Sequence, residues 1–303
     1  MDRLKRIFDI QKNFTNKYHE YQNIDVDNLE QKQQQTKEYI LCLIKESTEI
    51  LDEINWKQHK LNKQKILEDN IIEESIDSFK YLLNIIQLWN FDDNKFFDEF
   101  ERKSIVVAQK FEQEKLLKFS NKEKVAILDI DGILYPWPKE FLRFCLYYNI
   151  NYKFKNLYDF ESSIDLSERL KIKDEYRKSG IKATANVIDG AVEFTNKLKE
   201  LGYTIILVTA RPYQKYQRIY ADTLQWLNNH KIQFDAIIWE EQKEKYLIEK
   251  FPNAKFVVED DIENALILSR NGFKVYLKNT IYNESKATTE NIIRFNNFNE
   301  IEL

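Results

Sequence analysis

Glycine and proline are confined to one part of this 303-residue chain. All of them follow residue 131, at Gly132, Gly180, Gly190, Gly202 and Gly272 and at Pro136, Pro138, Pro212 and Pro252. Before that point the backbone lacks its most flexible residue and its strongest helix breaker, which favours long helices. Apolar residues recur there at helical spacing, most clearly from Ile40 to Ile54 and from Ile71 to Ile86. Residues 1–118 are therefore expected to form an all-α helical bundle.

The pattern changes after a polar connector, rich in Lys and Glu, at about residues 112–124. Short runs rich in β-branched and aromatic residues then alternate with helical segments, and these runs begin at Val125, Tyr203, Phe234, Phe256 and Phe273. Strands separated by helices of this length predict a parallel, doubly wound sheet. Residues 119–303 should thus form an α/β domain, with its functional groups just past the carboxyl ends of the strands.

The composition limits the classes of partner. The formal net charge is -4 and the pI is near 5.7, so we expect no stable binding of nucleic acid, which needs a basic surface. Two cysteines, Cys42 and Cys145, are too few for a disulfide framework and indicate a reducing compartment. No apolar run approaches the roughly 20 residues of a membrane span. We expect a cytoplasmic location, which would be the host cytoplasm if the protein is viral, and no membrane partner.

Polar residues follow the predicted strands of the second part. Asp129 and Asp131 come directly after the first strand, and Gly132 lets the chain turn away. Such a pair alone is typical of a turn, but at the carboxyl end of a strand it predicts a site for Mg²⁺ and phosphate. Three further features follow in order: the run Thr209-Ala-Arg211-Pro after the second strand, Lys243 or Lys245 at a helix start, and Glu259-Asp260-Asp261 after the fourth strand.

These four elements resemble the haloacid dehalogenase superfamily of phosphohydrolases, over about residues 123–285. The resemblance implies a Rossmannoid fold in which Asp129 is the nucleophile, forming an aspartyl-phosphate, and Asp131 is the general acid/base. Thr209 and Lys243 would hold the transferring phosphoryl group.

The same resemblance implies further ligands. Gly132 and Arg211 would contact the substrate, and Mg²⁺ would bind Asp129, the Asp131 backbone carbonyl and Asp260, with Asp261 or Glu259 as a further candidate. Lys243 is preferred to Lys245, because apolar residues follow Lys243 at helical spacing.

An insert of helical, aromatic-rich character separates the first motif from the next predicted helix, at about residues 134–187. In this superfamily an insert at that point is a small cap over the active site. Its length and composition resemble the helical cap of 5'-nucleotidases and deoxyribonucleotidases. The Thr-Ala-Arg-Pro run also resembles the corresponding motif of polynucleotide 3'-phosphatases.

Four carboxylates distinguish the helical part. Glu46 and Glu49 share a three-residue spacing with Glu74 and Asp77 on the next strongly apolar segment. One such pair alone is typical of a solvated helix face. Two pairs that flank apolar stripes converge if the stripes pack together, and four carboxylates at one interface favour a bound dication. We therefore predict a Mg²⁺ site formed by these residues.

This arrangement resembles the all-α nucleoside triphosphate pyrophosphohydrolases, the MazG-like and dimeric dUTPase group, over about residues 3–112. The resemblance implies nucleotide contacts by Gln11 of the opening helix and by Lys57 and Lys60 of the Asn-Trp-Lys-Gln-His-Lys segment. Lys103 would also meet phosphates, but Ser104, Val107 and Gln109 depart from the motif of the late helix, so base preference stays open. The group assembles as dimers or tetramers, which implies a homodimer or higher homo-oligomer through the helical domain.

The two resemblances imply consecutive reactions. The first half would convert a triphosphate, dUTP first and dCTP second, to the monophosphate and pyrophosphate by Mg²⁺-dependent attack of water. The second half would remove the remaining phosphate, and such a fusion is expected in viral or mobile-element nucleotide metabolism. Two alternatives stay open: a phosphatase of nucleic-acid ends whose helical half only dimerises the protein, and a helical half that senses nucleotide without hydrolysing it.

Overall fold

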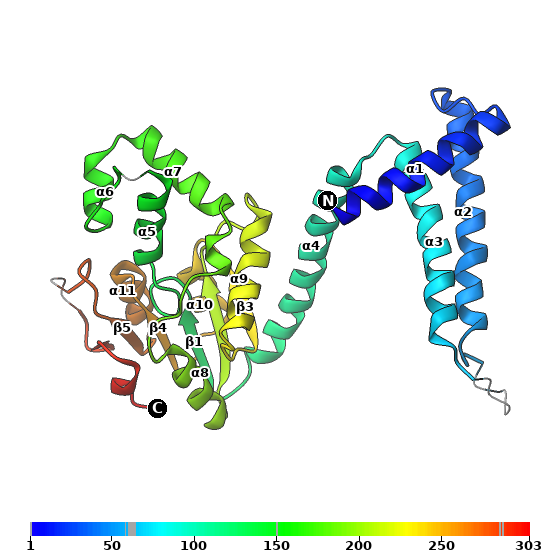
Figure 1. Ribbon diagram of the computed structural model, residues 1–303. Coiled ribbons are helices and arrows are strands. Elements are labelled where there is room, and N and C mark those ends of the chain that lie inside the picture. Colours follow the sequence, from blue (N-terminus) through cyan, green and yellow to red (C-terminus); the bar gives the residue numbers. More distant parts are fainter. Residues whose placement is uncertain (1, 58, 60–64, 150, 285, 287) are drawn as a thin grey trace. The chain divides into compact units, whose positions relative to one another are not determined.

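The computed structural model describes residues 2–57, 59, 65–149, 151–284, 286 and 288–303 (Figure 1). It divides into two compact units, Met1–Lys103 and Ser104–Leu303. The division falls inside one helix, α4 (Asp93–Phe119). The domain boundary expected between residues 118 and 119 lies at the carboxyl end of that same helix.

The first unit is helical, as the absence of glycine and proline predicts. It contains α1 (Arg3–Gln22), α2 (Leu29–Asp52), α3 (Glu68–Leu88) and the start of α4. Side-chain caps begin three of the helices: the carboxylate of Asp2 accepts from the amides of Leu4 and Lys5, the side chain of Asn28 caps α2 in the same way, and the carboxylate of Asp92 accepts from the amide of Lys95 at the start of α4. Helices α2 and α3 pack along each other, and α1 packs on α3.

The second unit contains a six-stranded sheet of order β3-β2-β1-β4-β5-β6, and all of its strand pairs are parallel. The predicted fold class, a helical domain followed by a parallel α/β domain, is therefore confirmed. The sixth strand was not predicted. The strands are β1 (Val125–Asp129), β2 (Thr204–Thr209), β3 (Ala236–Trp239), β4 (Phe256–Glu259), β5 (Val275–Lys278) and β6 (Ile292–Phe295).

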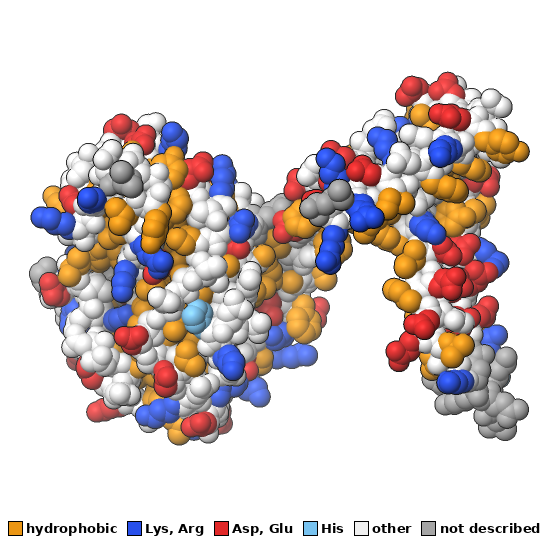
Figure 2. Space-filling view, viewed as in Figure 1, with side chains coloured by type: hydrophobic (Ala, Val, Ile, Leu, Met, Phe, Trp, Pro, Cys, Tyr) orange, Lys and Arg blue, Asp and Glu red, His pale blue; other side chains and the backbone are white. Residues whose placement is uncertain are grey.

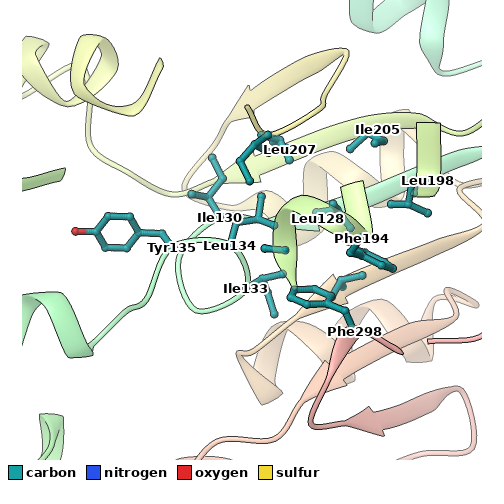
Figure 3. Close-up of a cluster of buried hydrophobic side chains, with 14 of the residues drawn as sticks. Leu128, Ile130, Ile133, Leu134, Tyr135, Phe194, Leu198, Ile205, Leu207 and Phe298 are labelled. Carbon is teal, nitrogen blue, oxygen red and sulfur yellow. The ribbon is translucent and has the colours of Figure 1, made fainter. Parts of the chain in front are cut away.

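Helices cover both faces of this sheet. On one face, α8 (Ala191–Glu200) and α9 (Gln217–Asn229) contribute Phe194, Leu198 and Trp226 to a core with alternate residues of β1 and β2 (Figure 3). On the other face lie α10 (Lys243–Lys250), α11 (Ile262–Arg270) and Leu116 of α4. Both faces of β1 are buried, which explains its uninterrupted apolar run.

The insert after β1 is helical, as predicted. It consists of α5 (Lys139–Tyr148), α6 (Leu157–Ser163), α7 (Leu166–Lys178) and the short 3-10 helix η1 (Ile181–Ala183). Its helices bury a small core of their own, in which the rings of Phe141 and Phe160 pack edge to face at 4.9 Å. We call residues 134–187 the cap.

Among the described residues, no helix is both long and apolar enough to cross a membrane. Cys42 and Cys145 are both free thiols.

Candidate active sites

The carboxyl edge of the sheet brings the predicted catalytic residues together. Asp129 ends β1, Thr209 ends β2 and Glu259 ends β4. Asp129 is only 4% exposed, and Lys243 Nζ lies 2.8 Å from its Oδ1 and 2.9 Å from Glu259 Oε2. Burial raises the pKa of Asp129, the nearby carboxylates Glu259 and Asp260 raise it further, and the ammonium of Lys243 opposes this rise.

Three carboxylates form a group that fits a hard cation. Oxygens of Asp129, Glu259 and Asp260 all lie within 4.8 Å of one another. Burial, followed by repulsion from Glu259, raises the pKa of Asp260 to about 8. A dication bound here would offset the repulsion among the carboxylates, and carboxylate oxygens are the ligands that Mg²⁺ prefers.

The structure separates the alternatives that the sequence left open. Asp261 does not join the group, because its carboxylate caps α11 by accepting from the amides of Glu263 and Asn264. Glu259 lies in the group but is held by Lys243. Lys245 is exposed and donates to Gln242, so of the two lysines only Lys243 reaches Asp129.

Gly132 makes a close approach that no other residue could make. Its φ is +88°, and a Cβ added there would lie 1.9 Å from Asp260 Oδ2. The absence of a side chain therefore lets the loop after β1 and the loop after β4 meet. The Gly132 carbonyl accepts from Lys278 Nζ at 3.0 Å, which ties the same loop to the end of β5.

Asp131 is held by an arginine that the predictions assigned to substrate binding. Arg211 Nε and Nη2 donate to the two oxygens of Asp131 at 2.7 and 2.8 Å. Burial alone would raise the pKa of Asp131, but Arg211 and Lys182 outweigh it and hold that pKa far below its usual range. Arg211 is also fixed by Thr223 Oγ1, which accepts from Nη1 at 2.8 Å, and its own amide donates to Thr209 Oγ1 at 3.2 Å.

Lys182, from η1 of the cap, was not predicted. Its side chain is 7% exposed, and Nζ lies 3.5 Å from Asp131 Oδ1 and near the rings of Tyr135 and Tyr176, at 4.7 and 5.1 Å. Burial and the neighbouring Arg211 lower the pKa of Lys182 to about 7. No motif marks this lysine in the sequence, and only the return of the cap to the sheet brings it to Asp131.

A cavity of about 230 Å³ joins the sheet edge to the cap. The sheet side contributes Asp129, Asp131, Arg211 and Lys243, and the cap contributes aromatic and cationic side chains. The cap residues are Trp137, Lys173, Tyr176, Arg177 and Lys182.

In the helical unit the predicted acidic residues also converge. Oxygens of Glu46, Glu74 and Asp77 lie within 4.8 Å of one another, so α2 and α3 do bring the two pairs together. Partial burial, followed by the surrounding carboxylates, raises the pKa of Glu46 and Glu74. Glu49 lies beside them but is paired with Lys45, which lowers its pKa.

This acidic group borders a cavity of about 470 Å³, which Glu46 and Asp77 line together with Gln11. Gln11 is buried, and its Nε2 donates to Asn84 Oδ1 at 2.7 Å. The same oxygen accepts from Thr15 Oγ1 at 2.7 Å. Gln11 thus lines the same cavity as two carboxylates of the acidic group. Asn84 was not predicted, since a lone asparagine on an apolar helix carries no signal in sequence.

Of the other predicted phosphate ligands, the described residues Lys57 and Lys103 do not line this cavity. Lys57 lies over the ring of Trp56 at 4.9 Å, and Lys103 is exposed on α4. Lys60 lies outside the described residues. Instead, Lys80 lines the cavity and pairs with Asp77 at 2.9 Å.

Comparison with known proteins adds one curated relative. No family model matches the chain. Over 79 residues the chain is 37% identical to a nucleotidase from Clostridium acetobutylicum. The match covers 26% of this chain and 41% of that protein, so the chain spans about two fifths of the length of this relative.

Solved structures resemble the chain more distantly. A D,D-heptose 1,7-bisphosphate phosphatase from Burkholderia thailandensis is 12% identical with a TM-score of 0.37, over 58% of this chain and 93% of that one. A haloacid dehalogenase-like family hydrolase from Streptococcus pneumoniae is 14% identical with a TM-score of 0.37, over 52% and 85%. A HAD hydrolase from Entamoeba histolytica is 15% identical with a TM-score of 0.36, over 59% and 96%.

The close approach at Gly132 predicts a specific loss of stability. Gly132→Ala should lower the free energy of unfolding by more than about 2 kcal/mol, because it combines backbone strain at positive φ with overlap on Asp260. Gly202→Ala is the matched control, since Gly202 has a φ of +79° but open space around it. That variant should lose only about 1 kcal/mol. Urea denaturation measures both, and equal losses would contradict the close approach.

Proposed function

We propose that the α/β unit is a Mg²⁺-dependent phosphatase that converts a nucleoside monophosphate to the nucleoside. The observation that carries this proposal is a buried carboxylate, Asp129, which lies 2.8 Å from Lys243 Nζ and within a group of carboxylates that fits a dication. The partial similarity to a nucleotidase supports the nucleotide as substrate.

The chemistry follows from the positions of two carboxylates. Asp129 attacks phosphorus, the bond from phosphorus to the nucleoside oxygen breaks, and Asp131 gives that oxygen its proton. Asp131 then takes a proton from the water that hydrolyses the aspartyl-phosphate. Mg²⁺ held by Asp129, Asp260 and the Asp131 carbonyl would neutralise charge on the phosphoryl group.

The ion pair between Arg211 and Asp131 must weaken before Asp131 can act as an acid in this mechanism. Paired with Arg211 in two hydrogen bonds, Asp131 is ionised and has no proton to give. A substrate phosphate would compete for Arg211 and so raise the pKa of Asp131 towards that of a useful acid. Asp131 would then take up a proton from solvent, and substrate binding would thereby prepare the acid that the reaction needs.

The shape of the cavity favours a small substrate. At about 230 Å³ it is smaller than a typical pocket for a drug-sized ligand, and the cap helices contribute much of its lining. This supports a mononucleotide in preference to the end of a nucleic acid.

Replacing the proposed nucleophile tests the assignment. Asp129→Asn should lower release of phosphate from nucleoside monophosphates by roughly 10⁴-fold or more, since it removes the attacking oxygen. Lys245→Met, at an exposed lysine that does not reach Asp129, should keep wild-type rates. Phosphate release in Mg²⁺ is measured by colorimetry. Phosphatase activity in Asp129→Asn close to that of the wild type would exclude Asp129 as the nucleophile.

We propose further that the helical unit hydrolyses a deoxynucleoside triphosphate, dUTP or dCTP, to the monophosphate and pyrophosphate. The supporting observation is that Glu46, Glu74 and Asp77 gather beside a cavity that Gln11 also lines. These carboxylates would hold Mg²⁺, which binds the triphosphate and activates water for attack at the α-phosphate. The product is the substrate proposed for the α/β unit, so the chain would be bifunctional.

Removal of the acidic ligands separates this proposal from a unit that only senses nucleotide or only dimerises. Glu46→Gln combined with Glu74→Gln should lower pyrophosphate release from dUTP by about 100-fold or more, because two metal ligands are lost. The control is Glu38→Gln, an exposed glutamate on the same helix as Glu46. Chromatography resolves triphosphate, monophosphate and nucleoside, and intact dUTP with the wild-type protein would contradict the proposal.

The helical unit also supports a proposal of self-association. Few of its apolar residues are buried, and many are exposed along its helices, including Leu41 and Ile44 of α2 and Ile72 and Ile76 of α3 (Figure 2). The spacing of three and four residues places each pair on one face of its helix. An apolar surface of this kind is typical of a protein interface, and we propose that a second copy of the chain covers it.

Introducing charged residues on the exposed apolar face of α2 should weaken this self-association. Wild-type protein at micromolar concentration should sediment as a dimer or larger species, and Leu41→Glu with Ile44→Glu should shift it towards the monomer. Leu201→Glu, at an exposed leucine of the α/β unit, should leave the sedimentation coefficient unchanged. A monomeric wild-type protein would contradict the proposal.

A further inference from the structure

The cap presents hydrogen-bond donors, and few acceptors, to the cavity above Asp129. Lys173 and Arg177 lie four residues apart on α7, so they share a face of that helix, and both line the cavity. Lys182 lines it from η1. Lysine and arginine side chains carry donors only. The hydroxyl of Tyr176, which could accept, is already within 2.8 Å of the Tyr135 hydroxyl.

These cationic groups are incompletely neutralised by the protein. Lys173 Nζ is 3.4 Å from Glu161 Oε1, longer than most charge-assisted hydrogen bonds. Arg177 lies over the ring of Tyr216 at 5.4 Å and has no carboxylate partner in the described part of the chain. Both groups therefore retain capacity to donate to a ligand.

The direction of the proposed reaction determines which part of the substrate lies next to Lys173 and Arg177. In an in-line displacement the leaving oxygen lies opposite the attacking one. Asp129 attacks from the sheet, while Thr209 and Lys243 belong to the sheet edge that holds the phosphoryl group. The nucleoside therefore extends towards Asp131 and the cap, where Lys173 and Arg177 are.

The lining beside these donors is aromatic. Trp137 faces the same cavity, and its ring packs on that of Tyr176 at 6.2 Å. An indole next to cationic donors suits a flat ring that carries acceptor atoms on its edge. Uracil and thymine present a carbonyl oxygen at position 4 of the ring, whereas cytosine carries there an amino group that only donates and keeps its acceptors at N3 and O2.

We propose that Lys173 and Arg177 determine base specificity, selecting nucleotides whose base presents carbonyl acceptors to the cap, uracil and thymine, over cytosine. The inference rests on the proposed phosphatase function of the α/β unit. A cytosine amino group presented to these donors would find no acceptor among them, and the loss of a hydrogen bond at the edge of the base lowers kcat/KM for the mismatched base.

The test compares dUMP, dTMP and dCMP as substrates of the full-length protein in Mg²⁺. We expect kcat/KM for dUMP and dTMP to exceed that for dCMP at least tenfold. Arg177→Gln supplies an amide oxygen that can accept from cytosine, so it should reduce the ratio of dUMP to dCMP at least fivefold. Lys178→Gln, at an exposed lysine paired with Asp174 on the same helix, should keep the wild-type ratio.

The outcomes separate failure of this inference from failure of the phosphatase function. Equal or better hydrolysis of dCMP by the wild-type protein would overturn the base assignment while leaving the phosphatase intact. So would an unchanged ratio in Arg177→Gln, or a tenfold preference for thymidine 3',5'-bisphosphate over dTMP, since a second phosphate would then be the ligand of these cations. No hydrolysis of any phosphomonoester, including p-nitrophenyl phosphate, would contradict the phosphatase function itself.

Discussion

The ion pair between Lys243 and two buried carboxylates is the interaction on which the α/β site depends. Asp129 and Glu259 end neighbouring strands, and the parallel sheet places both at one edge with almost no access to water. Two carboxylates in such surroundings would repel each other and lose hydration. One ammonium that contacts both, at 2.8 and 2.9 Å, offsets these costs. Removing one partner of a buried pair typically costs about 3–5 kcal/mol, because an uncompensated charge is left behind. The three groups therefore depend on one another.

Both candidate metal sites bring carboxylates close enough to repel one another, but the two sites differ in how that repulsion is offset. In the α/β unit the carboxylates are largely buried and accompanied by fixed cations, Lys243 and Arg211. In the helical unit Glu46, Glu74 and Asp77 are only partly buried. The exposed Lys80 pairs with Asp77 of this group, and the exposed Lys45 pairs with the neighbouring Glu49. Exposed ion pairs contribute little to stability. The helical group therefore relies more on a bound cation or on a covering surface to offset its repulsion.

The cap contacts the loop that follows β1. At the start of the cap, the hydroxyl of Tyr135 lies 2.8 Å from that of Tyr176, and Lys182, whose Nζ is 3.5 Å from Asp131 Oδ1, contacts both rings. The same cap supplies Trp137, Lys173 and Arg177 to the cavity, so the proposed base contacts and Asp131 border one space. Gly132 lets this loop approach the acidic strand end closely.

The sequence by itself determined the division into helical and α/β parts, because the distribution of glycine and proline and the change of apolar period are local properties. It also indicated Asp129, Asp131, Thr209 and Lys243 as candidate site residues, since each lies at or just past the end of a strand or opens a helix. It could not predict β6, whose two central residues are partly exposed and which lacks a fully buried apolar run. It could not predict which of Glu259, Asp260 and Asp261 would join the carboxylate group, because this depends on where the strand ends and where the cap of the next helix begins. Lys182, Trp137 and Asn84 reach their sites only through contacts between segments far apart in the chain. Tertiary structure alone decided these positions, because side chains from distant segments share an environment only after the chain has packed.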